Sequence, residues 1–429
     1  GLLIGSGVFV AAYFITQAGH LDQAEKVGPV FAVARGISSI FPRFVIWNPL
    51  PNSVATFLEG IFFLAMGMSL ALKPKSQKIP ALTAAGLLGG ALLISQSRGA
   101  WLGCATAAAA WLAVSDRRRG RWIGTAILVV IAILLVSSLW QENIPFLFDI
   151  PWIGSVLRSV FIRPDRLELY RNSLILIRDV PFTGIGLGDL FGFVYARYEL
   201  YIPYVFLSYS HNLFLDTWLQ QGLIGITALI WLAGVVGFSA FQKNAWEAPL
   251  GRGAWCGLAA IFVHAITDAR MVESLWCWLP FFTLLGLHAA LFQGYPSQGA
   301  GRFSRRAPAA LAMVFVIAVV IGFWPVGAAF RANEGALIEQ HAALRPGLAE
   351  AERAVMKIRA YDEFRRVLDA DPDNVTAHFR SGLISLEAGD HPSAVEHLTI
   401  AYQLAPQAPG IRKTLGLALA WTGEIEKAS

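Results

Sequence analysis

The residues that could do chemistry fall into three groups, and the first is the pair His211-Asn212. The pair stands at the start of a long apolar run, residues 212–240. An unperturbed imidazole titrates at a pH of about 6.5, so it can take a proton from a hydroxyl and return one to a leaving group. Asp216, one helical turn later, could orient the ring or cap the start of a helix. The alternative is that His211 is a polar interface residue without a chemical role.

The second group surrounds Arg98, in the stretch 97–102, SRGAWL. A fixed cation near the hydrocarbon boundary of a membrane is costly, roughly 2.5–3.5 kcal/mol at the centre of a span and less toward the interface. It persists where it reaches lipid headgroups or where it binds an anion. Gly99 and Ala100 are small, which lets another backbone or a ligand approach closely.

The third group is a set of arginines in the stretch 163–178. Apolar and aromatic residues recur there with a helical period, which predicts an amphipathic helix at the outer membrane surface. Guanidinium groups offer a planar fork of donors that suits phosphate oxygens. The candidates for this role are Arg163, Arg166, Arg171 and Arg178. The alternatives are lipid headgroups, or salt bridges to Asp165 and Glu168.

The glycine-rich stretch 184–188, GIGLG, follows these arginines. It resembles a dinucleotide fingerprint only superficially, because no strand and helix of a Rossmann unit flank it. We predict a tight, close-packed re-entry of the chain toward the membrane here instead.

The elements that position these groups must be membrane helices. Of the 429 residues, 55% are hydrophobic and only 15% are charged, whereas a soluble domain averages about 25% charged. That much apolar surface cannot be kept in water, which predicts a polytopic, all-α membrane protein. The three cysteines have no metal-binding spacing and are interpreted as small buried residues. Nine runs are long enough to span, near 1–18, 53–72, 79–96, 99–115, 122–139, 212–240, 254–270, 274–292 and 308–330.

Four basic loops set the predicted orientation of these spans: 73–78, 116–121, 241–253 and 302–306. Short loops rich in Lys and Arg stay in the cytoplasm. All four fall on the same side when the nine spans alternate. The other side, which is the periplasm in a bacterium, then receives Arg98, the long loop 140–211 with His211, and the tail.

The tail after residue 330 is charged and helical in pattern, and it repeats. Gly382 recurs as Gly416 and Gly389 as Gly423, and two further positions keep the same offset of 34 residues. This pattern resembles a tetratricopeptide repeat. We therefore expect a transmembrane domain, 1–330, and a periplasmic repeat domain, 331–429. The chain begins inside an apolar run and ends inside a repeat, so we expect both domains to be incomplete.

Taken together, the three groups are similar to the O-antigen ligase and O-antigen polymerase superfamily. That family carries an Arg-x3-Leu motif and a His-Asn motif on its periplasmic face. Here Arg98–Leu102 fits the first motif, and Arg163–Leu167 fits it equally well. His211-Asn212, with Gly222 and Gly225 after it, fits the second. The resemblance covers about residues 50–290.

The resemblance implies transfer of a glycan from undecaprenyl diphosphate to an acceptor hydroxyl, at the periplasmic face of the bacterial inner membrane. Arg98 and His211 would be catalytic, with the arginine neutralising the leaving diphosphate and the histidine deprotonating the acceptor. Arg163, Arg166, Arg171 and Asn212 would bind the diphosphate and the glycan. No cofactor, metal or nucleic acid is implied, although Asp268 and Glu273 could contribute to a metal site.

Several alternatives remain for the function. The acceptor is lipid A-core in a ligase, a second lipid-linked glycan in a polymerase, or a protein hydroxyl in a protein glycosylating enzyme. The repeats would offer a surface to a protein partner. A transporter should show internal symmetry and charge at mid-membrane, where His264 is the only candidate and is interpreted as a packing residue. A membrane scaffold would not need Arg98 and His211.

Overall fold

The computed structural model describes residues 1–20, 29–114, 118–139, 164–188, 190–199, 207–240, 248–293, 302–424 and 426. Within these ranges every regular element is a helix, which confirms the predicted all-α class. The chain divides into two compact units. Unit 1 comprises 1–163 and 232–308, and unit 2 comprises 164–231 and 309–429. Arg163 lies outside the described residues.

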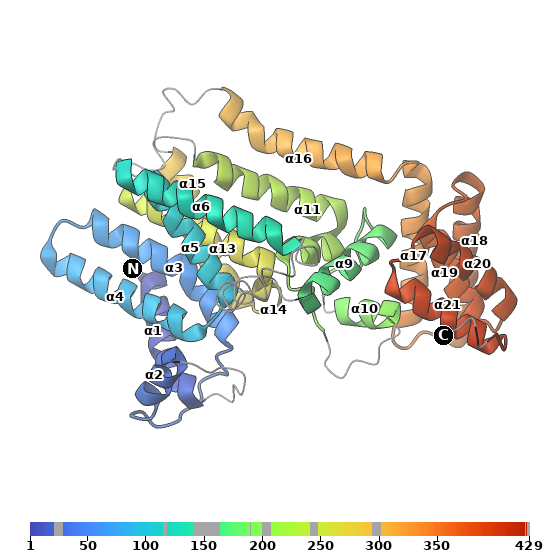
Figure 1. Cartoon of the computed structure of the whole chain (residues 1–429), viewed down its shortest axis with the longest axis horizontal. Helices are drawn as coiled ribbons and strands as arrows, with labels where there is room; N and C mark the ends of the chain where they lie inside the picture. The colour runs from blue at the N-terminus through green and yellow to red at the C-terminus, as the bar shows by residue number, and fades with distance from the viewer. Residues whose placement is uncertain are drawn as a thin grey trace. The chain divides into compact units, whose positions relative to one another are not determined.

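Unit 1 is a bundle of apolar helices in which α1, α3, α4, α5 and α13 lie side by side (Figure 1). Backbones approach closely where α3 meets α13: a Cβ on Gly257 would lie 2.8 Å from the carbonyl oxygen of Gly60. Small residues at such crossings are typical of membrane helices. The described helices of this bundle are α1 (Leu2–Gln17), η1 (Ala18–His20), α2 (Pro29–Ser38), α3 (Pro51–Ala71), α4 (Lys75–Ser95), α5 (Arg98–Ala113), α6 (Arg118–Leu139), α13 (Pro249–Thr267), α14 (Arg270–Glu273), η3 (Leu275–Cys277) and α15 (Trp278–Gln293).

Unit 2 combines two helices of the predicted loop with the helices of the tail. Its described helices are α9 (Pro164–Asp179), α10 (Phe191–Glu199), most of α11 (Leu213–Ser239) and of α16 (Arg302–Gly322), then α17 (Val326–Leu344), α18 (Glu350–Ala370), α19 (Val375–Glu387), α20 (His391–Leu404) and α21 (Pro409–Trp421). One hydrophobic core joins Leu176 and Ile177 of α9 to Phe364 and Phe379 of the tail. Part of the apolar side of α9 is therefore covered by the tail, and its predicted place at the membrane surface stays a prediction.

Five described helices are long and apolar enough to cross a membrane. They are Leu2–His20, Pro51–Ala71, Lys75–Ser95, Leu213–Ser239 and Pro249–Thr267, each at a predicted span. Helix α5 has 16 residues and so does α15, which is short for a span. The bent pair formed by α16 and α17 would bring the number to six. The predicted total of nine spans stays a prediction.

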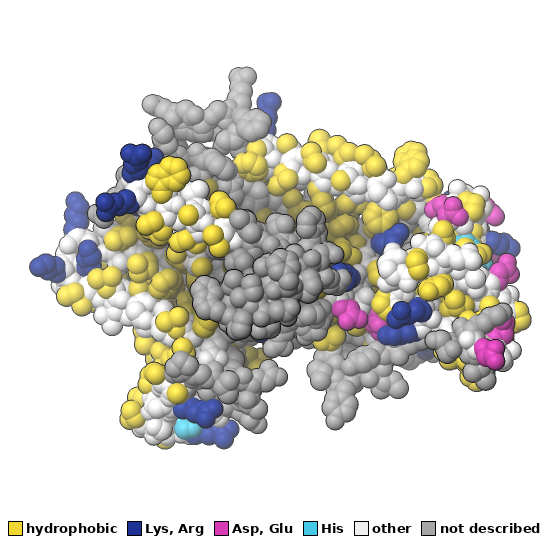
Figure 2. Space-filling model, viewed as in Figure 1, with side chains coloured by type: hydrophobic (Ala, Val, Ile, Leu, Met, Phe, Trp, Pro, Cys, Tyr) yellow, Lys and Arg dark blue, Asp and Glu magenta, His cyan; other side chains and the backbone are white. Residues whose placement is uncertain are grey.

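The predicted span 308–330 is wrong as one continuous helix. Helix α16 ends at Gly322 and α17 begins at Val326, with a bend of 86° between them. Pro325 stands at the start of α17, where a residue without an N–H can begin a helix but cannot continue one. Hydrophobic side chains gather along α16 (Figure 2) and are exposed there, among them Met313, Val314 and Ile321.

The tail helices repeat with the spacing of the sequence. Helix α19 spans Val375–Glu387 and α21 spans Pro409–Trp421, so both ends are offset by 34 residues. Gly389 and Gly423 each follow one of these helices with positive φ values of 79° and 85°. The equivalent turns require glycine for the same reason, because a left-handed backbone is costly for other residues. A separate repeat domain from residue 331 stays a prediction, since the compact units divide the chain elsewhere.

Candidate functional site

His211 lies on the turn that begins α11, and this turn is held by its own side chains. Asn212 is the N-cap, because its side-chain oxygen accepts two backbone N–H groups of the first turn, at 3.0 and 3.2 Å. The carboxylate of Asp216 accepts the backbone N–H of Ser210 at 2.8 Å. This bond ties Asp216 to the turn that precedes α11, and the two roles predicted for Asp216 stay predictions.

The backbone of His211 is left-handed, with a φ of 59°. Such a conformation costs a non-glycine residue about 1–3 kcal/mol and persists only where its surroundings fix it. The hydroxyl of Tyr170 donates to the carbonyl of His211 at 3.1 Å. The ring of Tyr209 packs on the imidazole, with ring centroids 4.3 Å apart. The half-buried imidazole is therefore held from the backbone and from one ring face.

Helix α9 connects the candidate arginines to this turn. Tyr170 lies on α9, and Arg166 precedes it by four residues, so the two side chains share one face of the helix. Arg171 is the next residue after Tyr170 and points about 100° away around the helix axis. Arg166 is half-buried, whereas Arg171 is exposed. The structure thus places Arg166 on the face of α9 that meets the His211 turn.

The glycine-rich stretch packs against a break in α11, which confirms the close packing predicted for it, whereas the predicted re-entry toward the membrane stays a prediction. Gly222 interrupts α11 with a φ of 63° and a ψ of −158°. The freed backbone groups bond to the stretch beside them: Ile185 N–H donates to Leu219 at 2.6 Å, and Leu223 N–H donates to Phe182 at 3.1 Å. A Cβ on Gly222 would overlap the carbonyl of Phe182. This contact fixes the chain between α9 and α11.

Arg98 lies in unit 1, at the first position of α5. The residue before it, Ser97, has its hydroxyl 3.4 Å from Nε2 of His264. The Nδ1 atom of the same imidazole lies 3.1 Å from both carboxylate oxygens of Glu59. A Cβ on Gly99 would come within 2.9 Å of His264 Nε2. The residues on either side of Arg98 are therefore both fixed against His264.

The chain Glu59–His264–Ser97 was not predicted from the sequence. Glu59 is fully buried and His264 is 1% exposed. The interpretation of His264 as a packing residue is incomplete, because both of its ring nitrogens have polar partners. The signal that could have found this chain is Glu59 itself, since an acidic residue inside a span is costly and usually functional.

No metal centre stands out in the part of the chain that the structure describes. There, no three His, Cys, Asp or Glu side chains group in a way that could hold an ion. Asp268, one of the two acidic residues considered for such a site, accepts a hydrogen bond from the side-chain amide of Asn52 at 2.8 Å. It also lies 3.7 Å from Arg270.

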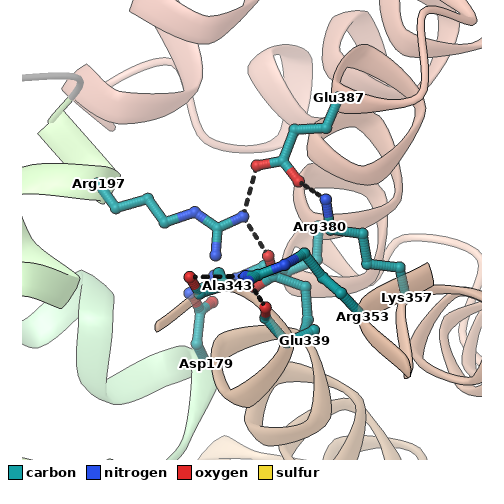
Figure 3. Close-up of polar contacts among 9 residues, drawn as sticks. Asp179, Arg197, Glu339, Ala343, Arg353, Lys357, Arg380 and Glu387 are labelled. Atoms are coloured by element: carbon teal, nitrogen blue, oxygen red, sulfur yellow. Dashed lines mark hydrogen bonds and ion pairs between the residues drawn. The ribbon is translucent and has the colours of Figure 1, made fainter. Parts of the chain in front are cut away.

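A buried network of charges binds the end of α9 to the tail (Figure 3). Arg380 of α19 lies 2.5 Å from Asp179 and 2.8 Å from Glu339. Burial acts to lower the pKa of Arg380, but the two carboxylates outweigh it and raise that pKa above its usual value. Arg197 of α10 bridges Glu339 and Glu387. Breaking such a network is strongly destabilising, because it leaves an unpaired buried charge.

The carboxylate of Glu387 also pairs with Lys357 of α18, at 2.8 Å. Burial acts to raise the pKa of Glu387, but Arg197 and Lys357 outweigh it and hold that pKa below its usual value. Three cations thus meet three carboxylates, from α9, α10, α17, α18 and α19. The tail and the two loop helices therefore form one polar network as well as one apolar core.

Comparison with known proteins adds one match. The family model described as O-antigen ligase matches residues 83–230, which include Arg98, Arg166, Arg171 and His211-Asn212. No curated protein and no solved structure matches the chain. Together with the five or six apolar helices, the family match fits a multi-pass membrane protein. The match over residues 83–230 supports the O-antigen ligase superfamily and points to glycosyltransferase activity of the ligase or polymerase type.

Proposed function

We propose that this protein transfers a glycan from undecaprenyl diphosphate to an acceptor hydroxyl at the periplasmic face of the bacterial inner membrane. The observation that carries the proposal is the O-antigen ligase match over residues 83–230. It contains all three groups of residues whose chemistry suits this reaction. The tie from Tyr170 to His211 supports it further, because it joins the arginine-bearing helix to the turn of the candidate base.

In the proposed reaction, His211 takes the proton of the acceptor hydroxyl as the acceptor oxygen forms a bond to the anomeric carbon. The bond from that carbon to the diphosphate oxygen breaks, and the lipid diphosphate leaves with the electron pair. Arg166 and Arg171 hold the negative charge that develops on the phosphate oxygens. The diphosphate ester supplies the energy, so no nucleotide is consumed.

Five further assignments rest on the resemblance or on sequence patterns. Arg98 is proposed as a catalytic cation, and Arg163 as a further diphosphate ligand. Asn212 is proposed to contact the glycan with its amide group, in addition to capping α11. The active site and the tail are proposed to face the periplasm, which the distribution of the basic loops supports. The tail is proposed to be a tetratricopeptide repeat domain, whose 34-residue offset between α19 and α21 supports that assignment.

We propose lipid A-core as the acceptor, with a second lipid-linked glycan or a protein hydroxyl as the alternatives. The test offers each acceptor to the purified full-length protein with a labelled undecaprenyl-diphosphate glycan. Label on lipid A-core supports the ligase. A ladder on the lipid carrier identifies a polymerase, and label on a protein band identifies a protein glycosylating enzyme.

The residue control in this assay compares His211→Ala with His391→Ala. His391 lies at the first turn of α20, where its ring stacks on Trp421. We expect His211→Ala to abolish transfer and His391→Ala to leave it unchanged. Full activity in His211→Ala would remove the histidine from the mechanism. Glycan flux across proteoliposomes without any product would instead identify a transporter, and no activity of either kind would favour a scaffold.

A further inference from the structure

Unit 2 contains a cavity of about 190 Å³ that the proposed reaction does not use. One wall is the end of α9, at Arg178 and Asp179, with Tyr198 of α10 beside it. A second wall is the bend between α16 and α17, at Phe323 and Trp324. The tail forms the remaining wall, so residues from three distant parts of the sequence line the cavity.

The tail contributes two equivalent turns to this cavity. Residues 371–374 join α18 to α19, and residues 405–408 join α20 to α21. The turns are offset by 34 residues, so they are the same position of two successive repeats. The cavity thus lies at the edge where the tail helices are joined.

Several polar groups in the lining have no partner among the residues that the structure describes. Arg178, Asp373 and Gln407 are exposed and make no side-chain hydrogen bond or ion pair with any described residue. Trp324 is 77% exposed. The cavity therefore offers a guanidinium, a carboxylate and an amide together with an aromatic ring.

Such a lining suits a sugar ring. The C–H face of a sugar packs on an aromatic ring, while planar polar side chains bind its hydroxyls as donors and acceptors. A diphosphate fits poorly, because the carboxylates Asp371 and Asp373 lie in the same lining as the single guanidinium of Arg178. We propose that this cavity binds a neutral sugar unit of a glycan.

The walls of the cavity are held in place before a ligand arrives. Asp179 accepts a hydrogen bond from the hydroxyl of Thr376 at 2.8 Å and pairs with the buried Arg380 (Figure 3). Asn374 donates to Asp371 at 2.9 Å and caps α19. A preformed site of this kind loses little entropy when it binds. These fixed walls favour a preformed binding site over a packing defect.

Given the proposed function, the cavity would hold a sugar of the donor or acceptor glycan away from the reacting bond. Binding energy from such a remote part of a substrate can position the reacting groups. This role makes the tail a part of substrate recognition, and it rests on the proposed function. The assignment of the cavity as a sugar-binding site does not rest on the proposed function, because it is argued from the residues that line the cavity.

The experiment measures sugar binding directly, by saturation-transfer NMR on the full chain in a detergent without a sugar headgroup. The probes are methyl glycosides of glucose, galactose, mannose and N-acetylglucosamine, and their short oligomers. Asp373→Asn and Gln407→Ala are compared with Asp369→Asn, which removes a charge on the exposed end of α18 outside the cavity. We expect saturable binding that weakens at least about tenfold in the two cavity variants and is unchanged in the control.

Trp324→Leu provides an independent check, since it keeps an apolar side chain at a position that could also anchor the chain at a membrane interface. Weaker sugar binding in this variant supports the proposal. The proposal is overturned if no probe binds saturably, or if Asp373→Asn and Gln407→Ala bind the sugar as well as the control Asp369→Asn does. It is also overturned if inorganic diphosphate or a peptide displaces the sugar. Normal sugar binding by His211→Ala, combined with unchanged glycan transfer, would refute the proposed mechanism while leaving this site intact.

Discussion

The hydroxyl of Tyr170 donates a hydrogen bond to the backbone carbonyl of His211 at 3.1 Å. This bond joins α9, which carries Arg166 and Arg171, to the turn in which His211 has a left-handed backbone. Tyr170 and His211 are 41 residues apart in sequence, so this tie is a property of the fold. It allows one helix to set both the cation positions and the orientation of the candidate base.

The first prediction follows from this tie. Tyr170→Phe removes only the hydroxyl, and a lost hydrogen bond of this kind costs about 1 kcal/mol. We expect glycan transfer to fall roughly fivefold, mainly in kcat, while the protein stays folded. Tyr402→Phe on the exposed side of α20 is the matched control. Equal rates for the two variants would show that the tie does not position His211.

The second prediction separates the two arginines of α9. Arg166 shares a face with Tyr170, whereas Arg171 is exposed and turned away. Loss of a charged hydrogen bond costs about 1.5–3 kcal/mol, so Arg166→Gln should raise KM for the lipid-diphosphate donor by roughly tenfold or more. Arg171→Gln should have a smaller effect. Initial rates at varied donor concentration provide the measurement, and a larger effect at Arg171 would contradict the helix geometry.

The third prediction concerns the break in α11. Gly222→Ala would place a methyl group against the carbonyl of Phe182 and on a backbone with a φ of 63°. We expect loss of at least about 2 kcal/mol in the free energy of unfolding, because neither the clash nor the strain can be relieved locally. Gly237→Ala lies on the same helix with open space around it. It should be neutral or slightly stabilising, and thermal unfolding in detergent compares the two.

The fourth prediction tests the polar chain beside Arg98. His264→Leu leaves the carboxylate of Glu59 buried without its imidazole partner, which should cost about 3–5 kcal/mol. Adding Glu59→Leu to that variant should recover part of the loss, because two apolar residues replace both partners. Melting temperatures of the two single variants and the double variant give the coupling energy. Strictly additive losses would mean that the two side chains do not interact.

Much of this fold could be predicted from the sequence, and the reasons are local. Five of the nine predicted spans coincide with helices long enough to cross a membrane, the helical period of 163–178 predicted α9, and the 34-residue offset recurs in the bounds of α19 and α21. The bend at Pro325 was missed, because the apolar residues continue on both sides of it. A run of apolar residues indicates how long a segment could be in lipid, but it does not indicate where the helix bends.

The polar partners could not be predicted because they meet only in the folded chain. Glu59 and His264 are 205 residues apart, and Asp179 and Arg380 are 201 residues apart. Each residue alone was visible as a costly or charged side chain, but no spacing connects the two. For the same reason, the sequence does not predict that the tail covers part of α9. Phe364 and Phe379 join the apolar residues of α9 in one core only in the folded chain.

The fifth prediction is a pH dependence of the tail. His397 has its Nε2 3.4 Å from the hydroxyl of Tyr361, and its Nδ1 lies 3.1 Å from Nδ1 of His378. Burial, and then the charge of His378, lower the pKa of His397 below its ordinary value of 6.5. The unfolded chain therefore binds more protons at His397 than the folded chain does, so stability rises with pH through this window. The contribution is present above a pH of about 6.5 and is lost as the pH falls below it.

His397→Gln should flatten this dependence, because glutamine does not titrate. Unfolding of the full chain in detergent, followed by far-ultraviolet circular dichroism between pH 5 and 8, gives the measurement. His391→Gln is the control, since His391 stacks on Trp421 and has no contact with the His378–His397 pair. If His391→Gln removes the pH dependence and His397→Gln does not, the imidazole pair is not its source. Otherwise a falling pH would loosen the packing of α19 against α20, because the pair His378–His397 joins these two helices.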